Sequence, residues 1–63
     1  MKADKRYNQW IIQDKDGFFY MSNVLNKGWT KDKNQAAYYN YRGAEQKIKD
    51  LGIDGLTIVD GVA

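Results

Sequence analysis

The chain has 63 residues and contains no cysteine, histidine or proline. A chain of this length builds one small core, so we expect a single domain. Without cysteine or histidine it lacks a thiolate nucleophile, a disulfide framework, a zinc finger and an imidazole acid or base. No apolar run approaches the roughly 20 residues that a membrane span needs, and the charged start lacks the apolar core of a secretory signal. We therefore expect a cytoplasmic protein with no membrane partner.

The charge balance is weakly basic. Ten Lys and Arg against eight Asp and Glu give a net charge of +2. Nucleic-acid binding is usually accompanied by a clustered basic face, which this composition does not predict. The cluster Lys2, Lys5 and Arg6 could contact phosphate, but a charged tail in solvent is favoured. We predict a flexible arm over residues 1–6 and a single α+β domain over residues 7–63.

The first half of the chain predicts an antiparallel hairpin. Residues 7–13 and 18–25 are rich in aromatic and β-branched side chains, and residues 14–17 read Asp-Lys-Asp-Gly, which is typical of a turn. Counting in steps of two assigns one face to the core: Trp10, Ile12, Phe19 and Met21. The opposite face is expected to be amphipathic and partly exposed, and carries Tyr7, Ile11, Phe18 and Tyr20.

The second half predicts two helices and a strand. A turn over residues 26–28 precedes a helix cap at Thr30 or Asp32, and a short helix through Ala36 and Ala37 is expected. Residues 38–41 are poor helix formers and favour extended backbone. The clearest helix is residues 42–51, which has apolar residues at helical spacing and ends at a glycine. Residues 56–60 form the last strand.

These elements predict a small α+β fold, in which one main helix covers an antiparallel sheet made of the hairpin and the C-terminal strand. The element order is strand, strand, short helix, helix, strand. The pattern leaves open which hairpin strand pairs with the last one. At least one sheet edge stays open, and an open edge can pair with another chain, including a second copy.

The residues present predict no catalytic site, no cofactor and no metal. Ser22 has no recognisable base partner. Asp14 and Asp16 flank a glycine turn, and the pattern of a calcium-binding EF-hand loop is not met. No glycine-rich loop stands between a strand and a helix to cradle phosphate. We therefore expect a protein that is not an enzyme.

The segment Tyr38-Tyr39-Asn40-Tyr41-Arg42 has the composition of a protein-binding hot spot, because Tyr and Arg are enriched at interface centres. We expect Tyr39 to point inward, with Tyr38 and Tyr41 outward. The alternative is that these rings fill the small core. The predicted partner-binding residues are Tyr20, Lys31, Lys33, Tyr38, Tyr41 and Arg42.

The run Trp10 to Tyr20, the step Gly28-Trp29-Thr30-Lys31-Asp32, and the helix with Ala44-Glu45 and Ile48 to Gly52 resemble small uncharacterised proteins of phages and prophages of Gram-positive bacteria. The resemblance covers residues 10–52. It implies a binding protein that inhibits a host enzyme or an antiviral defence protein in the host cytoplasm. The alternatives are a small nucleic-acid-binding accessory protein, using the basic side chains, and a structural or self-assembling protein.

Overall fold

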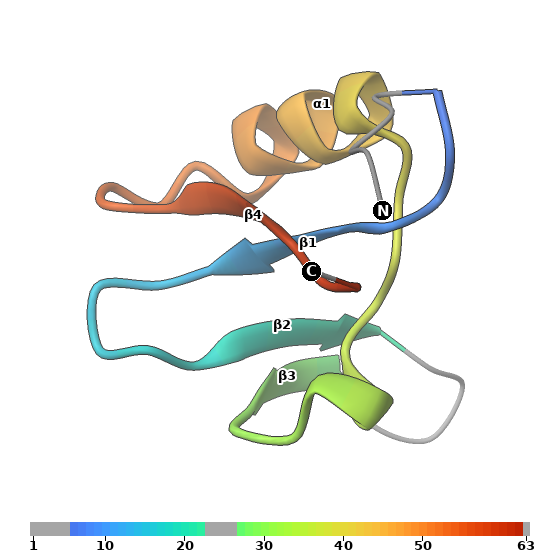
Figure 1. Ribbon diagram of the computed structural model, residues 1–63. Coiled ribbons are helices and arrows are strands. Elements are labelled where there is room, and N and C mark those ends of the chain that lie inside the picture. The colour runs from blue at the N-terminus through green and yellow to red at the C-terminus, as the bar shows by residue number, and fades with distance from the viewer. Residues whose placement is uncertain (1–5, 23–26, 63) are drawn as a thin grey trace.

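A computed structural model of the chain describes residues 6–22 and 27–62 and shows a four-stranded antiparallel sheet with one α-helix (Figure 1). The sheet order is β3-β2-β1-β4. The α+β prediction is therefore confirmed, and β4 pairs with the first hairpin strand rather than the second. The elements are β1 (Trp10–Gln13), β2 (Phe19–Ser22), β3 (Lys27–Thr30), the 3-10 helix η1 (Lys33–Gln35), α1 (Tyr41–Leu51) and β4 (Thr57–Asp60).

The turn between β1 and β2 is fixed by one carboxylate. Oδ1 of Asp14 accepts hydrogen bonds from the backbone N–H groups of Asp16 and Phe18, both at 2.9 Å. Gly17 has a φ of 88°, a left-handed conformation that glycine adopts without steric cost. The predicted turn is confirmed.

The hairpin opens beyond this turn, and the segment that leads into α1 fills the opening. Strands β1 and β2 are paired at Gln13 and Phe19. Further along, Ala37 N–H donates to Tyr20 O at 2.9 Å. Trp10 and Tyr39 exchange two backbone hydrogen bonds, of 2.9 and 2.8 Å. Figure 1 shows this segment crossing both strands on its way to α1. The extended backbone predicted before the helix is confirmed.

Each face of the sheet carries a hydrophobic cluster. The cluster under α1 contains the buried residues Trp10, Ile12, Tyr20 and Ala44. The smaller cluster on the other face contains Ile11, Phe19 and Ala36.

The prediction that grouped Phe19 with Trp10, and left Ile11 and Tyr20 partly exposed, is therefore wrong. Because Gln13 pairs with Phe19, the even-numbered residues of β1 and of β2 lie on the same face of the sheet. A turn that is one residue longer or shorter would instead place even-numbered residues of one strand beside odd-numbered residues of the other. Ile11 is fully buried because the second face is also covered.

Strand β3 was not predicted, because a turn was expected over residues 26–28. Lys27 and Gly28 are weak strand formers, and pairing with β2 holds this segment extended.

The short helix η1 lies earlier in the chain than the predicted helix through Ala36 and Ala37. It ends at Gln35, and Ala36 is extended with a ψ of 152°. Asp32 caps η1 by accepting from Asn34 N–H at 2.9 Å, which confirms one of the two proposed caps.

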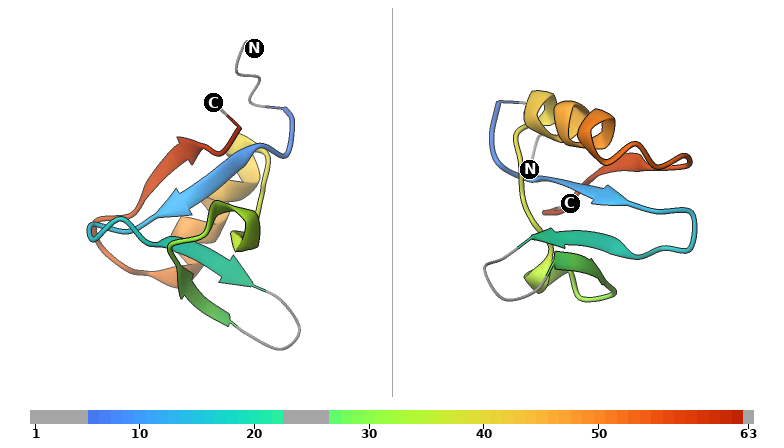
Figure 2. Two further views of the ribbon diagram at one scale, coloured as in Figure 1. Left: turned by 60° about the horizontal axis from the view of Figure 1, so that its bottom comes forward. Right: turned by 180° about the vertical axis from the view of Figure 1, so that it is seen from behind.

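Helix α1 covers the β1–β4 half of the sheet (Figure 2). It begins at Tyr41, one residue before the predicted start, because the side chain of Asn40 accepts from Gly43 N–H at 2.7 Å. It ends at Leu51 and is followed by Gly52, whose φ of 64° is the left-handed cap that the sequence predicted. Residues 1–5 of the arm predicted over residues 1–6, and residues 23–25 of the second predicted strand, lie outside the described residues.

Candidate docking surface along strand β4

Strand β4 has an unpaired edge in the part of the chain that the structure describes, because it ends the strand order. Gly61 N–H donates to Gln9 O at 2.7 Å, which continues the ladder between β4 and β1. Hydrogen-bonded pairs alternate along an antiparallel ladder, so Val59 and Thr57 also bond to β1. The residues between them, Ile58 and Asp60, direct their N–H and C=O groups away from β1.

An apolar groove runs beside this edge, between α1 and β4. Its volume is about 410 Å³. Ile48, Leu56 and Ile58 also pack against the cluster under α1, so the groove's apolar surface is continuous with the core. Glu45 and Lys49 are exposed on the helix side. We call this site the α1–β4 groove; its lining is Tyr41, Glu45, Ile48, Lys49, Leu56, Thr57 and Ile58.

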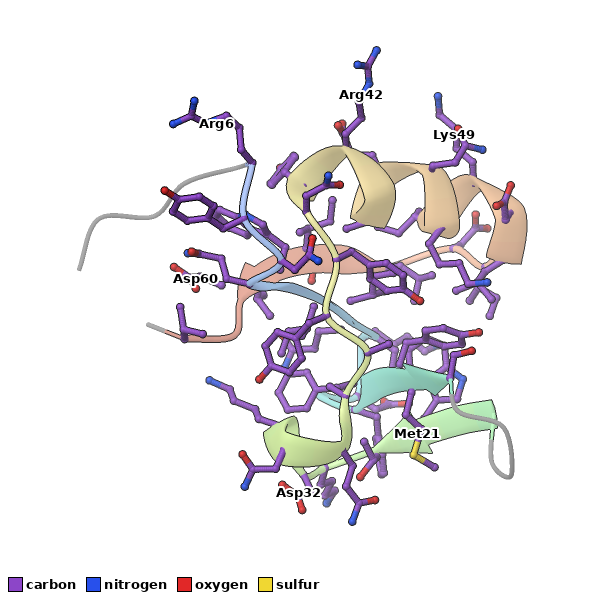
Figure 3. The ribbon with its side chains drawn as sticks, turned by 90° about the vertical axis from the view of Figure 1, so that its right-hand side faces the viewer. Arg6, Met21, Asp32, Arg42, Lys49 and Asp60 are labelled. Carbon is purple, nitrogen blue, oxygen red and sulfur yellow. The ribbon has the colours of Figure 1, made fainter. Side chains whose placement is uncertain are left out.

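A second hollow of about 620 Å³ lies at the start of α1. It shares Tyr41 and Glu45 with the α1–β4 groove, so the two adjoin. Figure 3 shows Arg6 and Arg42 projecting from the helix side of the molecule. The hollow is lined by Arg6, Asn40, Tyr41, Arg42 and Glu45.

The large hydrophobic side chains that the described residues expose lie around β4. Ile53 (46% exposed) precedes the strand, and Val62 (56% exposed) follows it. Tyr7 (62% exposed) precedes β1, whose first residue pairs with the last residue of β4. Each is a single exposed side chain next to β4 or to its neighbour β1 in the sheet.

Two predicted contact residues, Tyr41 and Arg42, lie at this surface. The Tyr41 ring packs edge-on against Trp10, with the ring centroids 5.0 Å apart, and the same side chain lines both hollows. Arg42 is exposed at the first turn of α1. Tyr41 therefore belongs partly to the core, the alternative that the sequence left open.

The other predicted contact residues lie elsewhere. Tyr20 is buried (6% exposed) and packs edge-on against Trp29. Lys31 and Lys33 are exposed between β3 and α1 and do not line the α1–β4 groove, and Lys31 Nζ lies 5.1 Å from the Phe18 ring centroid. The structure therefore does not assemble the six predicted residues into one surface.

The tyrosines between η1 and α1 both pack inward. Tyr38 is half-buried against the second cluster, and its hydroxyl lies 3.1 Å from Lys33 O and 3.4 Å from Gly61 O. Tyr39 packs against the cluster under α1, as predicted. Burial raises the pKa of the Tyr39 hydroxyl, nearby Lys47 lowers it, and Tyr20 raises it further. Tyr38 was expected to point outward, and its contact with the second face explains the difference.

The described residues offer no group of three or more acidic side chains positioned to hold a metal ion. No helix among them has the length and apolar character needed to cross a bilayer. The chain matches no family model, no curated protein and no solved structure.

Sequence reasoning missed the groove residues Leu56 and Ile58 as contact candidates. Leu56 and Ile58 stand at alternate positions, which predicts a strand with one apolar face. This pattern does not show that the strand lies at the edge of the sheet. The apolar position Ile48 in the helix was the only further signal, and it was equally consistent with a fully covered core.

Proposed function

We propose that the protein is a non-enzymatic protein-binding module whose partner docks in the α1–β4 groove and pairs with the free edge of β4. The observation that carries the proposal is an apolar groove beside two residues, Ile58 and Asp60, whose backbone groups face outward. Strand addition combines these features: main-chain hydrogen bonds supply affinity, and the groove receives alternate side chains of the added strand.

The kind of partner follows from the sequence. The resemblance to small phage and prophage proteins supports a bacterial host protein, such as a host enzyme or a defence protein, bound in the host cytoplasm. Tyr41 lines the groove and Arg42 lines the adjoining hollow, and they are the aromatic and cationic residue types that are enriched in hot spots. Nucleic acid is less well supported, because Arg6 and Arg42 line one hollow that neither Lys31 nor Lys33 lines.

Site-specific photo-crosslinking tests the proposal. A photoreactive residue at Thr57, which is exposed beside the groove, is compared with one at Asn34, which is exposed in η1. Irradiation in a bacterial host is expected to give protein adducts at Thr57 and few at Asn34. Equal labelling at both positions, or none at Thr57, contradicts the proposal. A gel shift with nucleic acid that weakens steeply with salt would support the accessory protein instead.

A further inference from the structure

We infer that Asp54 is a site of spontaneous isomerisation to isoaspartate, and that the fold protects the two other Asp-Gly pairs of the chain. The dipeptide occurs at residues 16–17, 54–55 and 60–61. A glycine after aspartate favours the reaction, because no Cβ atom hinders the approach of its backbone nitrogen to the neighbouring carboxyl group. The three pairs share this chemistry and differ in the structure around them. The inference goes beyond the proposed function, because it needs no partner.

The reaction uses only the protein and water. The backbone nitrogen of the glycine attacks Cγ of the protonated aspartate carboxyl group, the N–Cγ bond forms, and the hydroxyl group leaves with the nitrogen's proton as water. The product is a succinimide ring. Water then adds to one of the ring's carbonyl carbons and cleaves its bond to nitrogen. Cleavage at Cγ restores aspartate, whereas cleavage at the main-chain carbonyl gives isoaspartate. The nitrogen and the carboxyl group must therefore be free to meet.

The pair Asp60-Gly61 is held at both reacting groups. Gly61 N–H donates to Gln9 O at 2.7 Å. The Asp60 carboxylate accepts from Gln9 Nε2 at 3.1 Å and from Val62 N–H at 3.0 Å. Attack requires these bonds to break, which means a local opening of the sheet where β4 meets β1.

The pair Asp16-Gly17 is held at the attacking nitrogen. Gly17 N–H donates to Asp14 O at 3.2 Å. The N–H groups of Asp16 and Phe18 both donate to Asp14 Oδ1, at 2.9 Å. These three bonds fix the backbone on both sides of the reacting peptide group. The Asp16 side chain is exposed, but the nitrogen that it needs is engaged by the turn.

The pair Asp54-Gly55 has neither restraint. Both residues are exposed and lie in the connection between α1 and β4 (Figure 1). Within the part of the chain that the structure describes, neither the Asp54 carboxylate nor Gly55 N–H has a hydrogen-bond partner. The two reacting groups can therefore meet without breaking a bond of the fold.

Isomerisation at this position lengthens the connection between α1 and β4. Isoaspartate carries the main chain through Cβ and Cγ, which adds one atom. Leu56, two residues further along, packs against the cluster under α1 and lines the α1–β4 groove. Thr57 pairs with Gln13 at the start of β4. The longer connection is therefore expected to loosen the packing of Leu56 and to lower the melting temperature.

Peptide mapping of the full chain after prolonged warm incubation tests the inference. Tandem mass spectrometry with electron-based fragmentation locates isoaspartate in each proteolytic peptide. Isoaspartate is expected to form at Asp54 about tenfold faster than at Asp16 or Asp60, because each of those pairs must first break at least one hydrogen bond. In the chain unfolded by urea, the three rates are expected to be similar.

Asp54→Glu is the matched variant. It keeps the charge, but its longer side chain would have to close a larger ring. Incubation is expected to lower the melting temperature of the wild type and to leave that of Asp54→Glu unchanged, and circular dichroism checks that the variant is folded.

Similar rates at the three positions of the folded protein would overturn the inference. Protection of Asp54 in a folded chain that reacts there in urea would also overturn it. A preference for Asp54 that persists in urea would do the same, because the neighbouring sequence rather than the fold would then set the rates.

Discussion

The ring of Tyr41 meets the indole of Trp10 edge-on, with centroids 5.0 Å apart and planes at 84°. Trp10 is buried in β1, whereas Tyr41 opens α1 and lines the α1–β4 groove. The contact therefore ties one wall of the groove to the core. A partner docking there meets a surface that is already ordered, so less side-chain freedom is lost on binding.

This contact predicts that alanine substitutions at the neighbouring residues Tyr41 and Arg42 lower the free energy of unfolding by different amounts. Tyr41→Ala is expected to lower the free energy of unfolding by about 2 kcal/mol, because it removes a half-buried ring and an aromatic pair. Arg42→Ala changes an exposed side chain and is expected to cost less than about 0.5 kcal/mol. Urea denaturation measures both. Equal losses would show that the ring contributes no packing.

Gly61 is required by the close approach of Tyr38. A Cβ atom at Gly61 would lie 2.5 Å from Cε2 of the Tyr38 ring, too close without a shift of the ring. Gly61→Ala is therefore expected to destabilise the fold by about 1–3 kcal/mol, the usual cost of overpacking. Gly28→Ala is the control, since nothing lies within 4 Å of its Cβ position. Thermal unfolding compares them, and equal melting temperatures would contradict the prediction.

The hairpin turn predicts that removing the carboxylate of Asp14 destabilises the fold more than removing that of Asp16. Asp14→Ala removes the acceptor of two backbone hydrogen bonds and is expected to cost about 1–3 kcal/mol. Asp16→Ala changes an exposed side chain and is expected to cost about 0.5 kcal/mol or less. Chemical denaturation of both variants provides the test. A larger loss for Asp16→Ala would be inconsistent with the observed turn.

Tyr39 predicts a loss of stability in alkali. Burial raises the pKa of its hydroxyl in the folded state above the value of about 10 in the unfolded state. Between the two pKa values the folded state holds more protons, so stability falls as pH rises through this window and is unaffected below it. Tyr39→Phe is expected to flatten the stability profile above pH 10, whereas Tyr7→Phe, at an exposed position, is the control. Identical profiles for wild type and Tyr39→Phe would contradict the assignment.

The features predictable from sequence depend on neighbours in the chain. The turn at residues 14–17 and the helix ending at Gly52 are set by local hydrogen bonds and by glycine conformations, so their residues suffice to place them. The strand at residues 57–60 was likewise placed from its alternating pattern.

The features that were missed depend on distant pairing. Lys27 and Gly28 become a strand only beside β2, and the faces of the hairpin depend on a register that pairs Gln13 with Phe19. Strand β4 has an unpaired edge because it pairs with β1 and no described strand follows it in the sheet. Composition predicted a contact role for Tyr20 as well as for Tyr41 and Arg42, because it does not show that Tyr20 is buried.

Amide hydrogen exchange at two adjacent residues tests most directly whether the β4 edge is a docking site. Val59 N–H faces β1 and is expected to be protected throughout. Ile58 N–H faces outward, so it is protected only when another strand pairs with the edge. We predict that Ile58 of isotope-labelled protein becomes protected when lysate of a bacterial host is added, whereas Val59 is protected with and without the lysate. Rapid exchange of Ile58 in the lysate, beside a protected Val59, would show that no partner strand occupies the edge.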